Sequence, residues 1–264
     1  MAGRLRAFLG NPLSGLAPWI VMAVMSGIVP FEAAVGLAFL SAAAILAANT
    51  ILEGSQKALE YTDTGYFLLL GLVGLFSAES VRDWLDVWAD ELSSIALTAF
   101  ALGSIALRRP FTLPYARERV PPEVWGTPRF VRTNYLVSGV WAAAFFVAAV
   151  AGFYGDAVLD DSENLWTAWI VPTAAMLAAV QFTLWYPRVV RAEADAEMGR
   201  TGEPAPPATE MLAGMVAYLP LAGAVVLAFD AGPWWIGVAL IVAGPLIGGR
   251  VARDRREARE AARP

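Results

Sequence analysis

The chain has 264 residues, of which 58% are hydrophobic and 16% are charged, and its formal net charge is −5. It contains no His and no Cys. These absences exclude disulfides, a thiol nucleophile and a His-based catalytic relay, and they remove the usual ligands of zinc, copper, haem and iron–sulfur centres. A mean hydropathy of +0.55 is typical of a protein that crosses a membrane several times.

Eight apolar segments follow one another along the chain. A helix needs about 20 residues to cross a hydrocarbon core about 30 Å thick, so the shorter segments have ends that are defined to within a few positions. The sequence predicts an all-α polytopic membrane bundle of about eight transmembrane helices, arranged as hairpins in a single domain over residues 1–264. The expected spans are 14–29, 33–52, 65–79, 92–107, 135–154, 164–187, 210–229 and 232–249.

The first apolar run, "LAPWIVMAVMSGIV" at 16–29, follows Arg4 and Arg6 and therefore has the charge pattern of a signal peptide. No small-residue cleavage site followed by a polar mature start comes after it. The apolar sequence "PFEAAVGLAFL" begins immediately instead. Residues 14–52 are therefore predicted to form a tight helical hairpin with Pro30 at its turn.

Lys and Arg residues are distributed unevenly among the connections between the expected spans. If both termini are cytoplasmic, 18 of the 19 fall on the cytoplasmic side, and only Arg82 falls on the other. The positive-inside rule therefore predicts cytoplasmic termini and an even number of spans. Residues 250–264, "RVARDRREAREAARP", are expected to form a basic cytoplasmic tail.

Residues 108–134 form the main expected cytoplasmic loop, which joins the fourth and fifth spans and holds six arginines and five prolines. Proline disfavours a long helix here, so the loop is expected to be ordered by packing or to run along the membrane surface. Its basic and aromatic side chains suit anionic lipid headgroups at the cytoplasmic face. No nucleic-acid partner is expected, because one short loop offers no recognition fold. The residues predicted to bind lipid or another ligand are Arg109, Tyr115, Arg117 and Arg119.

Three amide side chains, those of Asn49, Asn134 and Gln181, lie near the cytoplasmic ends of their expected spans. They have two interpretations: hydrogen bonds between helices, or a polar cleft that opens to the cytoplasm and includes Tyr115 and Arg117. The expected spans contain almost no ionisable residue, and Lys57 is assigned to a cytoplasmic connection. No cofactor, metal site or catalytic residue is expected.

Gly244 and Gly248 lie four positions apart in the last expected span. This spacing allows two helices to approach closely. Packing within the bundle is the preferred interpretation, and a dimer interface is the alternative.

The segment "RRPFTLPYARERVPPEVWGTPRFVRTNYLVSGVW", together with "LAPWIVMAVMSG" and "FEAAVGLAFL", resembles uncharacterised bacterial membrane proteins related to the intracellular septation protein A group. The resemblance covers roughly residues 14–145. It implies a multi-pass protein of the bacterial cytoplasmic membrane with a role in the cell envelope, and it implies no catalytic residue.

Three functions remain open at this stage. The first is a non-enzymatic envelope protein that acts through lipids or membrane-protein partners, as the resemblance implies. The second is a transporter or channel for a small or lipid-like molecule, favoured by the prolines within several spans. An intramembrane enzyme comes third, because the expected spans lack acid and base groups.

Overall fold

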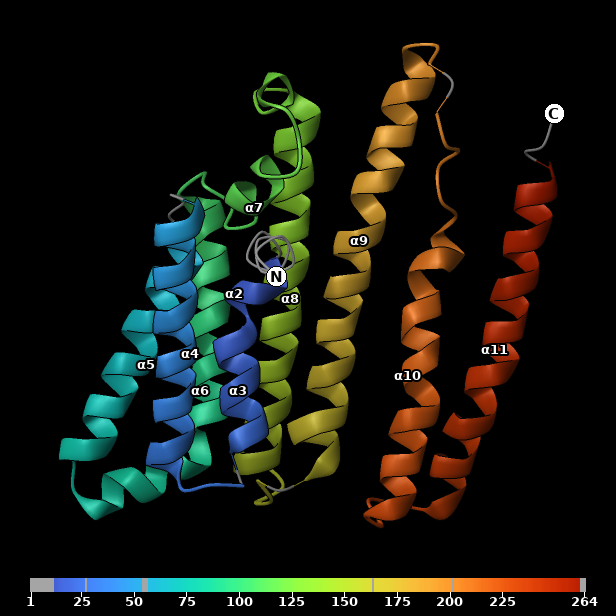
Figure 1. Cartoon of the computed structure of the whole chain (residues 1–264). Helices are drawn as coiled ribbons and strands as arrows, with labels where there is room; N and C mark the ends of the chain where they lie inside the picture. Colours follow the sequence, from blue (N-terminus) through green and yellow to red (C-terminus); the bar gives the residue numbers. More distant parts are fainter. Residues whose placement is uncertain (1–11, 27, 54–56, 163, 201, 262–264) are drawn as a thin grey trace. The chain divides into compact units, whose positions relative to one another are not determined.

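The computed structural model describes residues 12–26, 28–53, 57–162, 164–200 and 202–261, and every regular element in these ranges is helical (Figure 1). Six helices are long and apolar enough to cross a membrane. The prediction of an all-helical membrane protein is therefore confirmed. The six candidate spans are Phe31–Leu52, Glu79–Ala106, Pro128–Ala157, Trp166–Glu197, Ala208–Ala228 and Trp234–Arg253.

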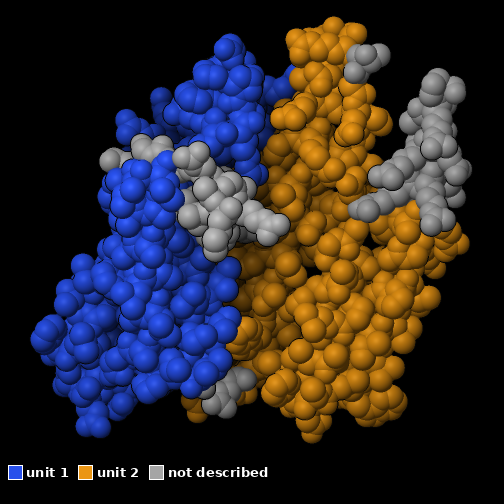
Figure 2. Space-filling view, viewed as in Figure 1, with its two compact units in different colours: residues 1–134 blue, residues 135–264 orange. Residues whose placement is uncertain are grey.

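The chain divides into two compact units, residues 1–134 and 135–264 (Figure 2). The boundary falls within helix α8 (Pro128–Ala157). Unit 1 contains the predicted loop 108–134, and unit 2 contains the C-terminal helices.

In unit 1, helices α3 (Ala17–Met25), α4 (Phe31–Ala48), α5 (Ala58–Phe76) and α6 (Glu79–Ala106) succeed one another in alternating directions (Figure 1). The predicted turn at Pro30 is confirmed, because the Pro30 carbonyl accepts the first backbone hydrogen bonds of α4. Small residues lie at the contact between α4 and α5. A Cβ atom at Gly74 of α5 would lie 3.1 Å from the ring of Phe31, and one at Gly71 would lie 3.5 Å from Val35 Cγ1.

Two of the eight predicted spans are not among the six candidates. Helix α3 has nine residues and is about 14 Å long, which is less than half the thickness of a hydrocarbon core. Helix α5 has 19 residues, but its first two turns include Glu60 and Asp63. The count of eight spans therefore stays a prediction.

The loop 108–134 has a defined path. It contains the short helix α7 (Leu113–Arg117) and a 3-10 turn, η2 (Pro122–Val124). Phe111, Thr112 and Tyr115 are buried, and the Thr112 hydroxyl donates to the Asn134 carbonyl at 3.2 Å. The prediction that packing orders the loop is confirmed.

In unit 2, a π-turn, η3 (Trp166–Ile170), leads into α9 (Val171–Glu197), and α10 (Ala208–Ala228) and α11 (Trp234–Ala261) form an antiparallel hairpin (Figure 1). Two tryptophans bind the connections at the two ends of α10 through hydrogen bonds to backbone carbonyls. Trp166 Nε1 donates to the Ala231 carbonyl at 2.8 Å, and Trp185 Nε1 donates to the Pro206 carbonyl at 3.0 Å.

Close packing of α10 on α11 depends on glycine. A Cβ atom at Gly244 would overlap the ring of Pro220, and one at Gly248 would lie 3.6 Å from Val216 Cγ1. The predicted packing of Gly244 and Gly248 within the bundle is confirmed. The approach of backbone to backbone is closest at Gly223, where a Cβ atom would lie 2.5 Å from the Gly237 carbonyl oxygen.

Candidate functional site

A cluster of charged and polar side chains is buried in unit 1, where α4 ends and α5 begins. Lys57, Glu60 and Asp63 are each 1% exposed, and Asn49 and Tyr115 are fully buried. A buried charge is costly unless it is paired or neutralised. We call these five residues the polar cluster.

Local backbone structure brings these residues together. Helix α4 passes into a π-turn, η1 (Asn49–Glu53), and Asn49 is its first residue. Lys57 precedes α5 in an extended conformation. Glu60 and Asp63 then follow at three-residue spacing, which places them on one face of α5 together with the buried Phe67.

Lys57 is the centre of the cluster. Its Nζ atom lies 3.1 Å from Glu118 Oε1 and 3.9 Å from Glu60 Oε1, and it donates to Asn49 Oδ1 at 3.5 Å. The same atom lies 4.6 Å from the centre of the Tyr115 ring. Because Tyr115 and Glu118 come from the loop, Lys57 connects the loop to the start of α5.

Glu60 is only partly satisfied. Its Oε1 atom accepts a hydrogen bond from Asn49 Nδ2 at 2.5 Å. Its Oε2 atom and the Tyr115 hydroxyl are buried with no hydrogen-bond partner among the described residues. Burial raises the pKa of Glu60 to about 7, against the opposing effect of Lys57.

Asp63 is on the next turn of α5, before the apolar run that begins at residue 65. Its Oδ1 atom accepts a hydrogen bond from Trp19 Nε1 at 2.8 Å. The rings of Trp19 and Phe67 have their centres 4.8 Å apart. Burial raises the pKa of Asp63 to about 8, with a smaller contribution from the charge of Glu60.

The hydroxyl of Tyr115 lies against the short helix α2 (Pro12–Gly15). A Cβ atom at Gly15 would lie 2.6 Å from Tyr115 Oη and 2.7 Å from Leu59 Cδ2. Gly15 therefore has no room for a side chain. This contact and α7 close the cluster from two sides, and burial raises the pKa of Tyr115 above its ordinary value.

The polar cleft predicted from Asn49, Asn134 and Gln181 stays a prediction, because these residues belong to two units that are described separately. Asn49 and Tyr115 belong to the polar cluster. Asn134 donates to the Phe130 carbonyl at 2.9 Å and accepts from Thr112, so it fastens the loop to α8. Gln181 lies in unit 2, where a Cβ atom at Gly214 would meet its amide group.

The predicted arginines lie on the surface of the loop. Arg109, Arg117 and Arg119 are exposed, and the Arg117 guanidinium lies 5.3 Å from the centre of the Trp125 ring. Buried aromatic side chains hold the loop against the helices. Binding of headgroups or acidic partners by these arginines stays a prediction.

Lys57, Glu60 and Asp63 were not recognised as site residues from the sequence. The sequence assigns Lys57 to a cytoplasmic connection between two expected spans, 33–52 and 65–79. The signal that was present is the spacing Lys57, Glu60, Asp63, which places three ionisable groups on one helical face directly before an apolar segment.

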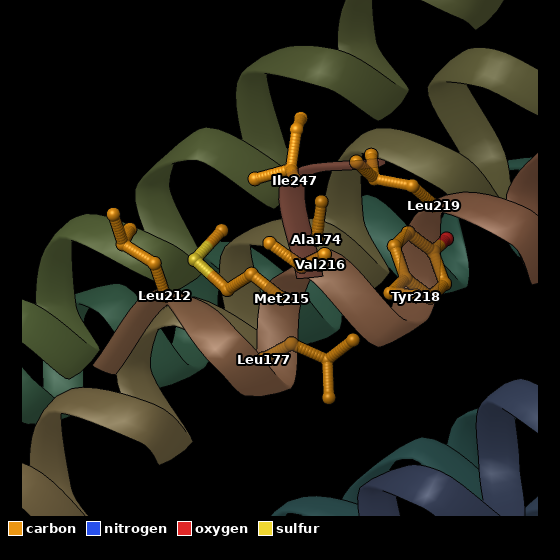
Figure 3. Close-up of a pocket in the computed structure, with 8 residues that line it drawn as sticks. All are labelled: Ala174, Leu177, Leu212, Met215, Val216, Tyr218, Leu219 and Ile247. Carbon is orange, nitrogen blue, oxygen red and sulfur yellow. The ribbon is translucent and has the colours of Figure 1, made fainter. Parts of the chain in front are cut away.

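Unit 2 contains an apolar pocket of about 200 Å³ between α9, α10 and α11 (Figure 3). Tyr218 contributes its ring to the wall, and its hydroxyl donates to the Ile170 carbonyl at 3.3 Å. The chemistry of the lining suits a hydrocarbon group and no charged one. The lining residues are Ala174, Leu177, Leu212, Met215, Val216, Tyr218, Leu219 and Ile247.

Comparisons with protein-family models, with curated proteins and with solved structures find no match for this chain.

Proposed function

We propose that the chain is a membrane transporter for a small molecule and that unit 1 holds its binding site. The observation that carries this proposal is the burial of Lys57, Glu60 and Asp63 beside helices that are apolar enough to cross a membrane. Ionisable residues kept at such a cost in membrane proteins mark ion and substrate pathways. The alternative role is a structural ion pair that holds the loop against α5. It explains the burial of Lys57 beside Glu118 but not the burial of Asp63.

The proposed topology has eight spans, with both termini in the cytoplasm of a bacterial cell. Two features of α5 support its crossing. It follows α4 and precedes α6 along the chain, its direction is opposite to theirs, and both of these helices are candidate spans (Figure 1). Its second half also exposes a large apolar face, which suits lipid better than water. That face consists of Leu68, Leu69, Leu72, Leu75 and Phe76.

The topology predicts where single cysteines can be labelled. Ala58 and Ala78 are exposed at opposite ends of α5, and the chain has no native Cys. In intact cells, a membrane-impermeant maleimide is expected to label Ala78→Cys and to leave Ala58→Cys unlabelled until the cells are opened. Labelling of both positions from one side would show that α5 does not cross and would remove the eight-span topology.

The chemistry of the site favours a ligand with a positively charged amine. Among the described residues, no Lys or Arg forms an ion pair with Asp63, and its hydrogen bond comes from the neutral Trp19 indole. No group of three or more acidic residues that could hold a metal ion occurs in the described part of the chain. An amine can bind one or two carboxylates without such a group.

The function is tested by ligand-dependent stabilisation in lipid nanodiscs. Monoamines, diamines and amino acids are added one at a time, and the unfolding temperature is measured. A ligand at about 100 times its Kd is expected to stabilise the protein by about 2.7 kcal/mol. The shift is expected to disappear in Glu60→Gln and to persist in Gln181→Ala, because Gln181 lies in unit 2. An equal shift in both variants would contradict a site in unit 1.

The second candidate function is a non-enzymatic envelope protein that acts through lipids or membrane-protein partners. The apolar pocket of unit 2 favours it, because a lipid acyl chain matches the lining. The exposed arginines of the loop also suit anionic headgroups. Stabilisation by anionic phospholipid, with no response to any amine, would favour this function over transport.

A further inference from the structure

The carboxyl group of Asp63 is buried, and no Lys or Arg among the described residues forms an ion pair with it. It is 1% exposed and lies between Trp19 of α3 and the aromatic side chains of α5. An isolated buried carboxylate loses its hydration without gaining a counter-charge. Protonation removes that cost, so a neutral carboxyl group is the form that this environment accepts.

Glu60 gives this proton a second position. It is on the same face of α5, one turn nearer the end of the helix that α7 covers. Its unpartnered Oε2 atom and the unpartnered Tyr115 hydroxyl are buried within the polar cluster. Two polar atoms without partners in one buried cluster indicate a place for a proton, or for a water molecule that carries one.

The other ionisable groups around the cluster favour a proton, rather than a metal cation, as the species that neutralises Asp63. Lys57 already brings a positive charge to Glu60, at 3.9 Å, and to Glu118, at 3.1 Å. Tyr115 of α7 and Tyr66 of α5 are neutral phenols near neutral pH. From α6, Asp90 acts on Tyr66, and Glu91 is buried. These groups do not form the multi-oxygen shell that a metal ion requires.

We propose that Asp63 is a proton-binding site and that the proton on Asp63 is exchanged for the cationic ligand during transport. When the amine binds, the O–H bond of Asp63 breaks, and its carboxylate pairs with the ligand. The released proton is accepted by Glu60 and passes to solvent beside Glu118, whose side chain is 30% exposed. When the ligand leaves, a proton returns to Asp63 by the reverse path. The exchange step rests on the proposed function, whereas proton binding by Asp63 does not.

Infrared titration tests the proton site directly. The full-length protein in nanodiscs is titrated between about pH 5 and pH 10, and the C=O absorption of protonated carboxyl groups is followed. In the wild type, a band is expected to disappear as the pH rises, with a midpoint above the ordinary range of an aspartate, because the Asp63 carboxyl group is buried. The part of the band that belongs to Asp63 is expected to be absent in Asp63→Asn, where the band of Glu60 remains. It is expected to shift in Asp63→Glu and to be unchanged in Asp83→Asn, which alters an exposed acid of α6.

A proton-flux measurement separates this inference from the proposed function. Liposomes containing the protein and a pH-sensitive dye are exposed to an outward gradient of the amine that stabilises the wild type, or of ethylamine. Proton movement opposite to the amine is expected for the wild type and Asp83→Asn, and its loss to the level of empty liposomes is expected for Asp63→Asn.

The outcomes are distinct. A titrating carboxyl band that is the same in the wild type and in a folded Asp63→Asn would overturn the proton site, whatever the flux. A titrating band without amine-driven flux would confirm the proton site and contradict the transporter. Unfolding temperature and elution volume establish whether each variant is folded, and Asp63→Glu replaces Asp63→Asn if the latter is not.

Discussion

Replacement of Lys57 with Met is expected to lower the free energy of unfolding by about 3 kcal/mol. Met keeps an unbranched apolar chain against the Tyr115 ring but removes the charge that Glu118 and Glu60 share. Removal of one partner of a buried ion pair costs about 3–5 kcal/mol, because the other partner is left uncompensated. The lower end of that range applies here, because Glu118 is 30% exposed and water reaches it.

The matched control is the exposed ion pair between Arg82 and Glu32 in the same unit. Its charged atoms lie 3.7 Å apart, and the side chains are 42% and 37% exposed. Arg82→Met is therefore expected to cost about 1 kcal/mol or less. Denaturant unfolding in micelles measures both variants. Equal losses, or a Lys57→Met variant more stable than the wild type, would show that the buried pair does not hold the loop in place.

A double-mutant cycle identifies the partner of Lys57. If Glu118 is the main partner, Glu118→Gln in the Lys57→Met background is expected to recover part of the lost stability. The coupling energy expected for two contacting groups is about 0.5–3 kcal/mol. Coupling with Glu60→Gln that exceeds coupling with Glu118→Gln would assign the ion pair to α5 itself rather than to the loop.

The second large effect is expected at the contact between α10 and α11. Gly223→Ala places a Cβ atom 2.5 Å from the Gly237 carbonyl oxygen and 2.9 Å from Ile241 Cγ1. The oxygen belongs to helix backbone and cannot move by itself, so the two helices must separate. Overpacking of this kind costs about 1–3 kcal/mol, which exceeds the gain of about 1 kcal/mol that Ala brings to a helix interior.

Gly249→Ala in α11 is the matched control, because its Cβ would meet no described atom within 4 Å beyond its chain neighbours and the nearby backbone of its own helix. It is expected to stabilise the protein by about 0.5–1 kcal/mol through helix propensity alone. Thermal unfolding in nanodiscs compares the two variants. A Gly223→Ala protein as stable as Gly249→Ala would show that the α10–α11 contact is looser than the structure describes.

Most of the helical architecture was predictable from the sequence, because the length of each apolar run determines whether it can form a membrane-spanning helix. Uncharged runs such as 135–154 are long enough to span a bilayer and coincide with α8, and Pro30 marks the start of α4 as expected. The loop was also partly predictable. Its prolines and aromatic residues predicted a fixed path, and Phe111, Tyr115 and Phe130 are buried along that path.

The polar cluster was not predicted, because it depends on contacts between distant parts of the chain. The sequence near Lys57 has the composition of an exposed linker, and only the packing of Tyr115 and Glu118, about 60 residues later, buries it. Gln181 is grouped with Asn49 and Asn134 by its place near a span end, and it belongs to unit 2. The polar cleft that these three residues are expected to line stays a prediction.

The contact between Lys57 and the loop has a consequence for the order in which the protein is made. Helices α4 and α5 leave the ribosome before Tyr115 and Glu118 are synthesised. Translation proceeds at about 5–20 residues per second, so the roughly 60 residues from Lys57 to Glu118 take about 3–12 s to synthesise. During that interval Lys57 lacks its nearest carboxylate, and the start of α5 must stay in contact with water or with the insertion machinery. Unit 1 therefore reaches its native packing only after translation has passed the loop, so a nascent chain that stops before residue 118 should be a preferred target for membrane proteases.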